Sequence, residues 1–224
     1  MIALLDSDIL CYRVGFSTNN DTESTALSTM ALFIEDLLLY DLLDTDNYEL
    51  FLTGKTNFRN DIAVTVPYKG NRKDVAKPVH LPLLREYLVT AWGAKMSVNQ
   101  EADDDIATRA TELGDEAMIV SIDKDFLQVP TWHYNFVKKI KQYVTVDEGL
   151  RFFYKQILTG DAADNIKGVY RVGPKTADKM LKELKTEQEL YQCCVEALGE
   201  VRVLENARLL WLRRYPDEMW NPPK

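Results

Sequence analysis

Short groups of acidic residues follow apolar, strand-like runs of the sequence. Asp6 and Asp8 follow the first such run, and Asp123 and Asp125 follow a later one. Aspartate and glutamate are almost never fully buried unless they are paired or bind a metal. Carboxylates without nearby histidine or cysteine select Mg²⁺ or Mn²⁺. Two such ions about 4 Å apart suit phosphodiester hydrolysis, because they activate water and stabilise the leaving oxygen.

Two further acidic groups extend this set. Glu101, Asp103 and Asp104 open an amphipathic segment, while Asp161 and Asp164 lie in a turn-rich stretch. Residues two apart do not share a helix face, so we expect Glu101 in a loop and the two aspartates in the first helical turn. Each acidic group alone has an ordinary explanation, because helix N-termini attract acids and aspartates favour turns and solvated loops. Their joint occurrence favours a metal site.

The elements that carry these acids alternate between strand and helix. Such alternation is typical of an α/β fold with a mainly parallel central sheet flanked by helices. These sheets bind ligands beyond the carboxyl ends of their strands, where the acids lie. The predicted strands are Ile2–Leu5, Tyr48–Leu52, Ala94–Val98 and Ala117–Ile122, and helix-length segments lie at Thr25–Leu43 and Leu81–Ala91.

The pattern becomes helical after residue 146. We therefore predict an α/β catalytic domain at residues 1–146 and a helical domain at 147–224, packed tightly together. The Pro-rich tail from Trp220 is either a terminal cap or an unfolded end. Two more strands are predicted at Trp132–Phe136 and Ile140–Val146, followed by helices at Asp147–Leu158, Lys175–Leu184, Glu187–Leu198 and Arg202–Arg214.

The composition excludes several classes of protein. No stretch approaches the roughly 18 apolar residues of a membrane helix, and the N-terminus lacks the features of a signal peptide, so we expect a cytoplasmic protein without a membrane partner. Three cysteines and two histidines supply neither a usual zinc set nor histidine-driven catalysis. The formal charge of -8 argues against a nucleic-acid partner unless the cations gather locally.

Two stretches gather cations in this way. Tyr68-Lys-Gly-Asn-Arg-Lys73 places three of them beside an aromatic ring, and Lys167-Gly-Val-Tyr-Arg-Val-Gly-Pro-Lys175 combines cations with glycines that allow close backbone approach. Pro174 suits the first turn of a helix whose free amides bind phosphate. The ordinary alternatives are an exposed basic loop for the first stretch and a packing corner between helices for the second.

Four motifs, in this order, resemble the 5' nuclease superfamily of flap endonucleases and 5'→3' exonucleases. The similarity covers nearly the whole chain, which looks like a stand-alone bacteriophage 5' nuclease. The motifs are Tyr68-Lys-Gly-Asn-Arg72, Glu101-Ala-Asp-Asp104, Ser121-Ile-Asp-Lys-Asp125, and Gly160-Asp-Ala-Ala-Asp-Asn-Ile-Lys-Gly-Val169 followed by Val172-Gly-Pro-Lys-Thr-Ala177.

The resemblance implies a PIN-like catalytic sheet and a C-terminal helix–three-turn–helix domain that grips duplex DNA by its backbone. It also implies a short arch at about 68–95, formed mainly by Lys73–Ala91, and K⁺ at the helix–three-turn–helix loop. Two Mg²⁺ ions, with Mn²⁺ as a substitute, are the implied cofactors. The implied metal ligands are Asp6, Glu101, Asp103, Asp104, Asp123, Asp125, Asp161 and Asp164.

The resemblance also assigns roles to residues that meet the substrate. Lys69 and Arg72 would stabilise charge on the transferring phosphate, and Asp123 is counted as catalytic as well as a ligand. The role of Asp8 stays open, and Asp105 is interpreted as a helix residue. The implied DNA-binding residues are Tyr68, Lys69, Arg72, Lys73, Lys167, Arg171 and Lys175.

One position departs from the family pattern. The family usually carries an aspartate after the second strand, a few residues before the pair Phe58-Arg59, and this chain has Thr53-Gly54-Lys55 there. The first metal site therefore lacks a usual acidic contact. We expect the enzyme to need more Mg²⁺ than relatives that carry aspartate at this position.

The sequence thus predicts a Mg²⁺-dependent 5' nuclease that leaves 5'-phosphate and 3'-hydroxyl ends. It does not separate exonuclease from flap endonuclease activity, and RNA–DNA hybrids stay open as substrates beside DNA 5' ends, flaps and nicks. A monomer is expected. Two alternatives remain: a structure-specific DNA-binding protein with weakened catalysis, and a PIN-type ribonuclease.

Overall fold

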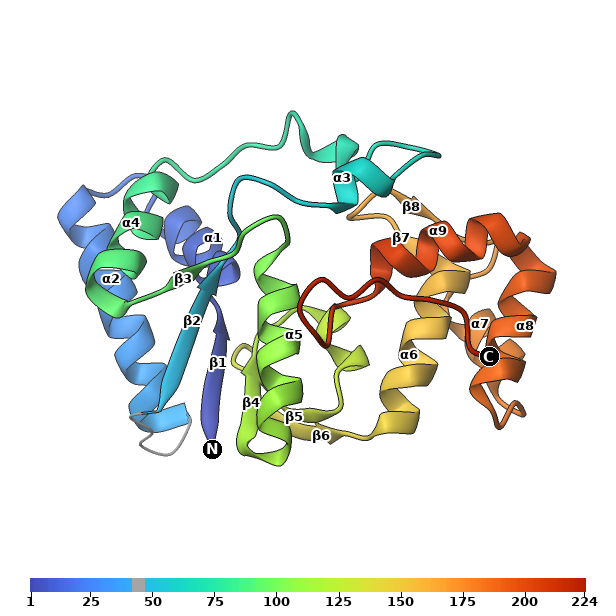
Figure 1. Cartoon of the computed structure of the whole chain (residues 1–224). Helices are drawn as coiled ribbons and strands as arrows, with labels where there is room; N and C mark the ends of the chain where they lie inside the picture. The colour runs from blue at the N-terminus through green and yellow to red at the C-terminus, as the bar shows by residue number, and fades with distance from the viewer. Residues whose placement is uncertain (42–46) are drawn as a thin grey trace.

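The computed structural model describes residues 1–41 and 47–224 and contains a mainly parallel six-stranded sheet (Figure 1). The strands lie in the order β3-β2-β1-β4-β5-β6, and only the last pair is antiparallel. The predicted α/β fold is confirmed. The strands are β1 (Ile2–Asp6), β2 (Tyr48–Leu52), β3 (Lys95–Met96), β4 (Ala117–Val120), β5 (Thr131–Asn135) and β6 (Ile140–Val144).

Helices cover both faces of the sheet because its strands bury side chains on both sides. Leu4 of β1 packs in the cluster that includes Ile106 of α5 (Ala102–Leu113). Its neighbours Ala3 and Leu5 point the other way, since successive side chains of a strand alternate between faces. They pack against α1 (Ser7–Ser17), α2 (Glu23–Asp36) and α4 (Leu81–Trp92), which lie together on the opposite face (Figure 1).

Two helices on that face differ from the sequence prediction. Helix α1 was not predicted, although Leu10, Cys11 and Val14 form a buried stripe along it. The predicted helix Thr25–Leu43 corresponds to α2 followed by the π-helical turn η1 (Leu37–Asp41), and its last two residues lie outside the described residues.

The second part of the chain forms a helical layer with its own core. Phe153, Tyr154 and Ile157 of α6 (Val146–Thr159) are fully buried within it. The other helices are α7 (Pro174–Leu181), α8 (Glu187–Leu198) and α9 (Glu200–Leu210). Shorter elements are α3 (Arg59–Ile62), the pair β7 (Gly160–Asp161) and β8 (Ile166–Lys167), and the 3-10 turns η2 (Gly70–Arg72), η3 (Gly114–Glu116) and η4 (Lys124–Gln128).

The C-terminal segment turns back toward α5 instead of continuing α9. The predicted helix Arg202–Arg214 is wrong beyond Leu210, because the backbone N–H of Arg213 leaves the helix to bond Asp104 on α5, at 3.2 Å. Leu212 packs with the α5 cluster, and Trp220 is only 5% exposed within the helical core. The segment therefore caps the junction of the two parts, and in Figure 1 it curls back beside α5 and α6.

The segment predicted as an arch, at about 68–95, includes a packed helix. Residues 81–92 form α4, whose Leu81, Leu84 and Leu88 are buried against α1 and α2. Only residues 73–80, here called the strap, cross from the helical part to α4 over the carboxyl ends of the strands (Figure 1). Gly15 marks where the strap meets α1, because a Cβ there would lie 2.6 Å from Pro78. None of the helices in the described ranges has the length and apolar character needed to span a membrane.

A buried ion pair joins the two parts. The two guanidinium nitrogens of Arg59 donate to the carboxylate of Asp104 at 2.5 and 2.8 Å, and the two residues are 1% and 0% exposed. Arg59 also donates to the carbonyls of Leu209 and Trp211, each at 2.8 Å. Although burial opposes ionisation, the Arg59 guanidinium holds the pKa of Asp104 below its usual value. The pair therefore connects α3, α5 and the end of α9.

We predict that Asp104→Ala lowers the free energy of unfolding by about 3–5 kcal/mol, because it leaves the Arg59 charge buried without a partner. Urea denaturation measures this loss. Asp147→Ala is the matched control, since it removes an exposed i,i+4 partner of Arg151 and should cost less than about 1 kcal/mol. Equal losses in the two variants would contradict the structural role given to Asp104.

Candidate active site

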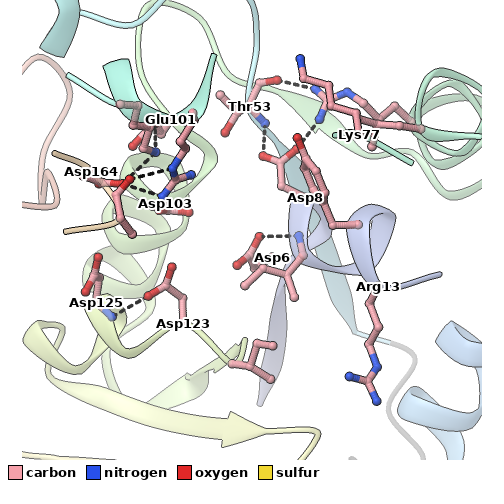
Figure 2. Close-up of a pocket in the computed structure, with 18 of the residues that line it drawn as sticks. Asp6, Asp8, Arg13, Thr53, Lys77, Glu101, Asp103, Asp123, Asp125 and Asp164 are labelled. Atoms are coloured by element: carbon pink, nitrogen blue, oxygen red, sulfur yellow. Dashed lines mark hydrogen bonds and ion pairs between the residues drawn. The ribbon is translucent and has the colours of Figure 1, made fainter. Parts of the chain in front are cut away.

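A cavity of about 1320 Å³ opens beyond the carboxyl ends of β1 and β4, beside the start of α5. Acidic side chains from the sheet and from the helical part converge on it (Figure 2). Seven of the eight predicted metal ligands line the cavity, and Asp8 lines it as well. The lining acids are Asp6, Asp8, Glu101, Asp103, Asp123, Asp125, Asp161 and Asp164.

The ends of β1 and β4 hold the central acids. Asp6 ends β1 and caps α1, accepting from the Ile9 N–H at 3.3 Å and from the Ser121 hydroxyl at 2.8 Å. Asp123 follows β4 and accepts from the Asp125 N–H at 2.9 Å. These strands are parallel neighbours, so their carboxyl ends bring Asp6 and Asp123 to one edge. The sequence prediction for this edge rested on the same rule.

The start of α5 supplies the next acids. Glu101 is the N-cap of α5, and Asp103 lies in the first turn, as predicted. The hydroxyl of Tyr68 lies within hydrogen-bond distance of both Glu101, at 2.9 Å, and Asp164, at 2.8 Å, and has one proton to share between them. Burial raises the pKa of Tyr68 well above its usual value, so the phenol stays a hydrogen-bond donor. Tyr68 thereby links an acid of the sheet part to an acid of the helical part.

The turn after β7 contributes the acids of the helical part. Asp161 accepts from the backbone N–H groups of Ala163 at 2.7 Å and Asp164 at 3.2 Å, which is an Asx-type turn. Gln156 of α6 donates to Asp125 at 2.7 Å. The acidic set is therefore fixed by contacts between segments that are distant in the sequence.

Cations of the chain lie among these acids and pair with them. Lys69 bonds Glu101, and Arg72 donates to Asp164 at 2.7 Å. Lys124 donates to Asp125 at 2.7 Å and to Asp161 at 2.6 Å. Within the described residues, no three acidic, histidine or cysteine side chains are arranged so that they could bind one metal ion. The internal cations balance the acids in this arrangement.

Burial raises the pKa of several of these acids. Burial raises the pKa of Asp6 to about 7, and the nearby Asp8 and Asp123 charges add to the rise. Burial and Asp123 raise the pKa of Asp125 to about 6, and burial with Asp6 raises that of Asp103 well above its usual value. Crowded carboxylates of this kind favour a divalent cation, which neutralises them. The donor set fits Mg²⁺, because every candidate ligand is a hard oxygen.

Asp104 is the one predicted metal ligand that does not lie among the residues lining the cavity. Its carboxylate is fully buried against Arg59. It also accepts from the N–H groups of Glu101 at 3.1 Å and Arg213 at 3.2 Å. Adjacent residues in the first turn of a helix point in different directions, so Asp103 and Asp104 cannot face the same cavity.

The departure at Gly54 has a steric basis. A Cβ at residue 54 would lie 2.0 Å from the backbone oxygen of Ser97, so no side chain fits there without backbone movement. Asp8 brings a carboxylate to the same place from α1, accepting from the Thr53 N–H at 2.8 Å. Arg85 of α4 pairs with Asp8 and bonds the Thr53 carbonyl. Figure 2 shows Asp8 between Thr53 and Asp6.

Several cavity residues were not singled out from the sequence. Lys124 was named only within the motif Ser121–Asp125, and Arg85 was given no role, although both line the cavity. Tyr12, Arg13 and Phe16 line the cavity from α1, which was itself not predicted. The signal available was the cap at Asp6 followed by the i, i+4 spacing of Tyr12 and Phe16, whose rings lie 6.2 Å apart.

The remaining predicted DNA-binding residues lie elsewhere. Lys73 is exposed at the start of the strap, outside the cavity lining. Lys167, Arg171 and Lys175 are exposed around the turn that precedes α7. Pro174 occupies the first turn of α7, as predicted. Of the cations predicted to bind DNA, the structure therefore brings Lys69 and Arg72 to the acids. It leaves Lys73, Lys167, Arg171 and Lys175 on the surface, outside the cavity lining.

The structure defines an α/β protein whose mainly parallel sheet carries a cluster of carboxylates at its carboxyl edge. A helical layer closes this acidic site. A family model described as 5'-3' exonuclease, N-terminal resolvase-like domain, matches residues 1–159. The chain belongs to this 5'-3' exonuclease family.

Individual relatives agree with this assignment. The chain is 28% identical over 210 residues to a 5'-3' exonuclease of Buchnera aphidicola subsp. Schizaphis graminum, covering 85% of this chain and 72% of the relative. It is 34% identical over 151 residues to flap endonuclease Xni of Shewanella piezotolerans, covering 59% and 57%. It is 30% identical over 226 residues to DNA polymerase I of Bacillus caldotenax, covering 89% of this chain but only 25% of the polymerase.

Solved structures share the fold. The T5 5'-exonuclease with bound zinc ions superposes with a TM-score of 0.69 at 20% identity, over 93% of this chain and 88% of the other. The bacteriophage T5 flap endonuclease in complex with DNA and metal ions gives a TM-score of 0.62 at 19% identity, over 93% and 92%. The predicted architecture, a parallel sheet with a C-terminal helical region, matches this fold.

The raised pKa values predict how stability depends on pH. A carboxyl group whose pKa is raised by folding contributes stability below its ordinary pKa and loses it as the pH rises through the raised value. Without metal, Asp6 should therefore cost stability progressively between pH 3.8 and about 7. Melting temperatures of the wild type and of Asp6→Asn in EDTA measure this, and the variant should gain relative to the wild type as the pH rises. A constant difference across this range would contradict the prediction, and Mg²⁺ should reduce the difference by neutralising Asp6.

We also predict that Gly54→Asp destabilises the protein by about 1–3 kcal/mol without lowering its Mg²⁺ requirement, because the Cβ collides with the Ser97 backbone. Urea unfolding and a Mg²⁺ titration of activity measure the two effects. Gly54→Ala is the control and should lose as much stability, since the collision involves Cβ and not the charge. A stable Gly54→Asp protein that needs less Mg²⁺ would refute this account. The higher Mg²⁺ requirement than in relatives stays a prediction.

Proposed function

We propose that this chain is a Mg²⁺-dependent nuclease that hydrolyses phosphodiesters at or near the 5' ends of DNA. The observation that carries the proposal is the cavity in which acids from β1, β4, α5 and the helical part meet Lys69 and Arg72. A carboxylate set made only of hard oxygen donors suits Mg²⁺, with Mn²⁺ as a substitute. Membership of the 5'-3' exonuclease family supports the same reaction.

The acids that line the cavity would hold two Mg²⁺ ions, and those ions would activate water and neutralise charge on the phosphate. Figure 2 shows Asp6 and Asp8 on one side of the cavity, with Asp103 and Asp164 in a second group and Asp123 and Asp125 in a third. In this proposal Asp123 is one of the residues that would bind the Mg²⁺ ions.

The two cations beside the acids have a separate role. Burial alone would lower the pKa of Lys69, yet Glu101 and Asp164 raise it, so its ammonium stays charged. Neutralisation of Glu101 and Asp164 by metal would free Lys69 and Arg72 to bind the scissile phosphate. The positive charges of Lys69 and Arg72 would then stabilise the negative charge that develops on the phosphate in the transition state. Tyr68 would position Glu101 and Asp164 through its hydroxyl.

DNA is the proposed partner. The exposed Lys167, Arg171 and Lys175 would bind the backbone of the duplex beside the cleavage site, with K⁺ held at the same turn. Lys73 would extend the contact along the strap. Nicks, flaps and RNA–DNA hybrids are the candidate substrates, acted on by a monomer in the cytoplasm. Flap endonuclease Xni and the 5'-3' exonuclease among the relatives support both modes of cutting.

A gel assay tests the reaction. Labelled 5'-flap, nicked duplex and RNA–DNA hybrid are incubated with Mg²⁺ or EDTA, with wild type and Asp123→Asn. We expect cleavage of the DNA substrates only with metal, leaving a 5'-phosphate, and its loss in the variant. Metal-independent binding of flaps without any cleavage would favour a DNA-binding protein, and cleavage confined to RNA would favour a PIN-type ribonuclease.

We predict that Lys69→Met lowers kcat about 100- to 1000-fold, since it removes a donor that stabilises the transferring phosphate. Single-turnover cleavage of the best substrate measures this. Lys95→Met is the matched control, because Lys95 pairs with Glu49 and lies outside the cavity lining. A loss of the same size in the control, or no loss in Lys69→Met, would show that Lys69 does not stabilise the transferring phosphate.

A further inference from the structure

A buried glutamine of α6 bonds one acid of the cavity without lining the cavity itself. Gln156 is 4% exposed, and its side-chain nitrogen donates to Oδ1 of Asp125 at 2.7 Å. Its side-chain oxygen, Oε1, has no hydrogen-bond partner among the described residues. The other buried side-chain atoms without a partner in this part of the chain are Trp92 Nε1 and Ser97 Oγ. Of these three residues, only Gln156 also bonds an acid of the cavity.

The amide of Gln156 cannot gain a partner by turning over. A half-turn about the last side-chain bond would exchange nitrogen and oxygen, so that Oε1 would face Oδ1 of Asp125. Two acceptor atoms at hydrogen-bond distance repel one another, so the carboxylate fixes the orientation of the amide. The unpaired oxygen of Gln156 is therefore a consequence of its bond to Asp125.

This arrangement is unfavourable for stability. A buried carbonyl oxygen without a partner loses its bonds to water and gains none in return. The bond at the other end of the amide offsets little, because the Asp125 side chain is 21% exposed and water can replace the glutamine there. Methionine has nearly the same length and shape as glutamine and has no polar atom to leave unpaired. On stability alone, an apolar residue would suit position 156 better.

The backbone around Gln156 is fixed against the turn that carries Asp125. Gly149 lies seven residues before Gln156 and therefore on the same face of α6. A Cβ at Gly149 would lie 2.7 Å from the backbone oxygen of Gln128, the last residue of η4. Helix α6 thus meets the backbone of η4 directly, and Gln156 reaches Asp125, the second residue of η4, from a fixed position.

Gln156 and Lys124 hold the same oxygen of Asp125. Lys124 also donates to Oδ1, at 2.7 Å, but its side chain is 60% exposed. Exposed ion pairs restrain their partners weakly, because both side chains stay in contact with water. The enclosed Gln156 is therefore the contact that orients the carboxylate. With Oδ1 engaged in this way, Oδ2 is the oxygen that an ion would take.

We propose that Gln156 is a positioning residue that orients Asp125 for a divalent ion, and that its unpaired oxygen is a loss of stability retained for this role. The inference rests on the proposed function. Hydrogen-bond partners of metal ligands fix the orientation of those ligands, and their removal weakens metal binding about 10- to 100-fold. A glutamine with only a packing role would behave in the opposite way, since its replacement would lower stability and leave metal affinity unchanged.

Calorimetric titration of the metal-free protein with Mn²⁺ alone tests the orientation, and thermal unfolding in EDTA tests the stability. We expect Gln156→Met to weaken Mn²⁺ binding about 10- to 100-fold and to raise the melting temperature by about 2–4 °C. Gln156→Leu gives the same two measurements if the methionine variant fails to fold. In an Asp125→Asn background, Gln156→Met should cause no further loss of Mn²⁺ affinity, because the glutamine acts through that carboxylate.

Gln128→Met is the matched control, because Gln128 is a buried glutamine with both ends of its amide paired. Its Nε2 donates to the Leu210 carbonyl at 2.9 Å, and its Oε1 accepts from the Leu212 N–H at 3.0 Å. This variant should lower the melting temperature and leave Mn²⁺ affinity unchanged. A lower melting temperature in Gln156→Met would overturn the proposal, as would a full further loss of affinity in the Asp125→Asn background.

The same measurements separate this inference from the proposed function. If the wild type binds Mn²⁺ and cleaves DNA while Gln156→Met binds Mn²⁺ equally well, the positioning role alone fails. If the wild type neither binds Mn²⁺ nor cleaves DNA, the proposed function fails with it.

Discussion

The buried pair of Arg59 and Asp104 is the interaction on which the rest of the site depends. It fixes the first turn of α5, where Glu101 and Asp103 face the cavity, to the end of α9 through the Leu209 carbonyl. Acids from the sheet and from the helical part meet only if these two parts keep one relative position. A buried charge that loses its partner is strongly destabilising, so the pair resists separation of the parts. An acid outside the cavity thus supports the acids inside it.

Charge balance is the second constraint on the cavity. The overall charge of -8 gives no sign of a phosphate-binding surface, yet Lys69, Arg72 and Lys124 lie among the acids. These cations pair with carboxylates that would otherwise repel one another at close range. The same side chains are the ones that a phosphate would meet once the acids are neutralised. Net charge is therefore a poor guide to function for this chain, because many charges of both signs are gathered and paired within a single cavity.

The sequence predicted those features that depend on local pattern. The strand ends that carry Asp6 and Asp123 follow from apolar runs, and the position of Glu101 as N-cap follows from residue spacing at a helix start. The buried contact of Asp104 was not predicted, because its partner Arg59 lies 45 residues away in the sequence and no local pattern reveals such a contact. The supposed arch beyond residue 80 was carried over from a resemblance, whereas the apolar spacing of Leu81, Leu84 and Leu88 already indicated a packed helix. Local periodicity identifies which face of a helix is buried, but it does not identify the distant segment that packs against that face.

The close contact at Gly54 also constrains the evolution of the site. Glycine codons lie a single base change from codons for acidic residues, so a carboxylate at this position arises readily by mutation. The Ser97 carbonyl, 2.0 Å from where a Cβ would stand, would make such a mutant unstable before the new acid could act. An acid at this position therefore requires a shift of the backbone at residue 97. Asp8, held at the Thr53 amide, brings a carboxylate to this place from α1 instead.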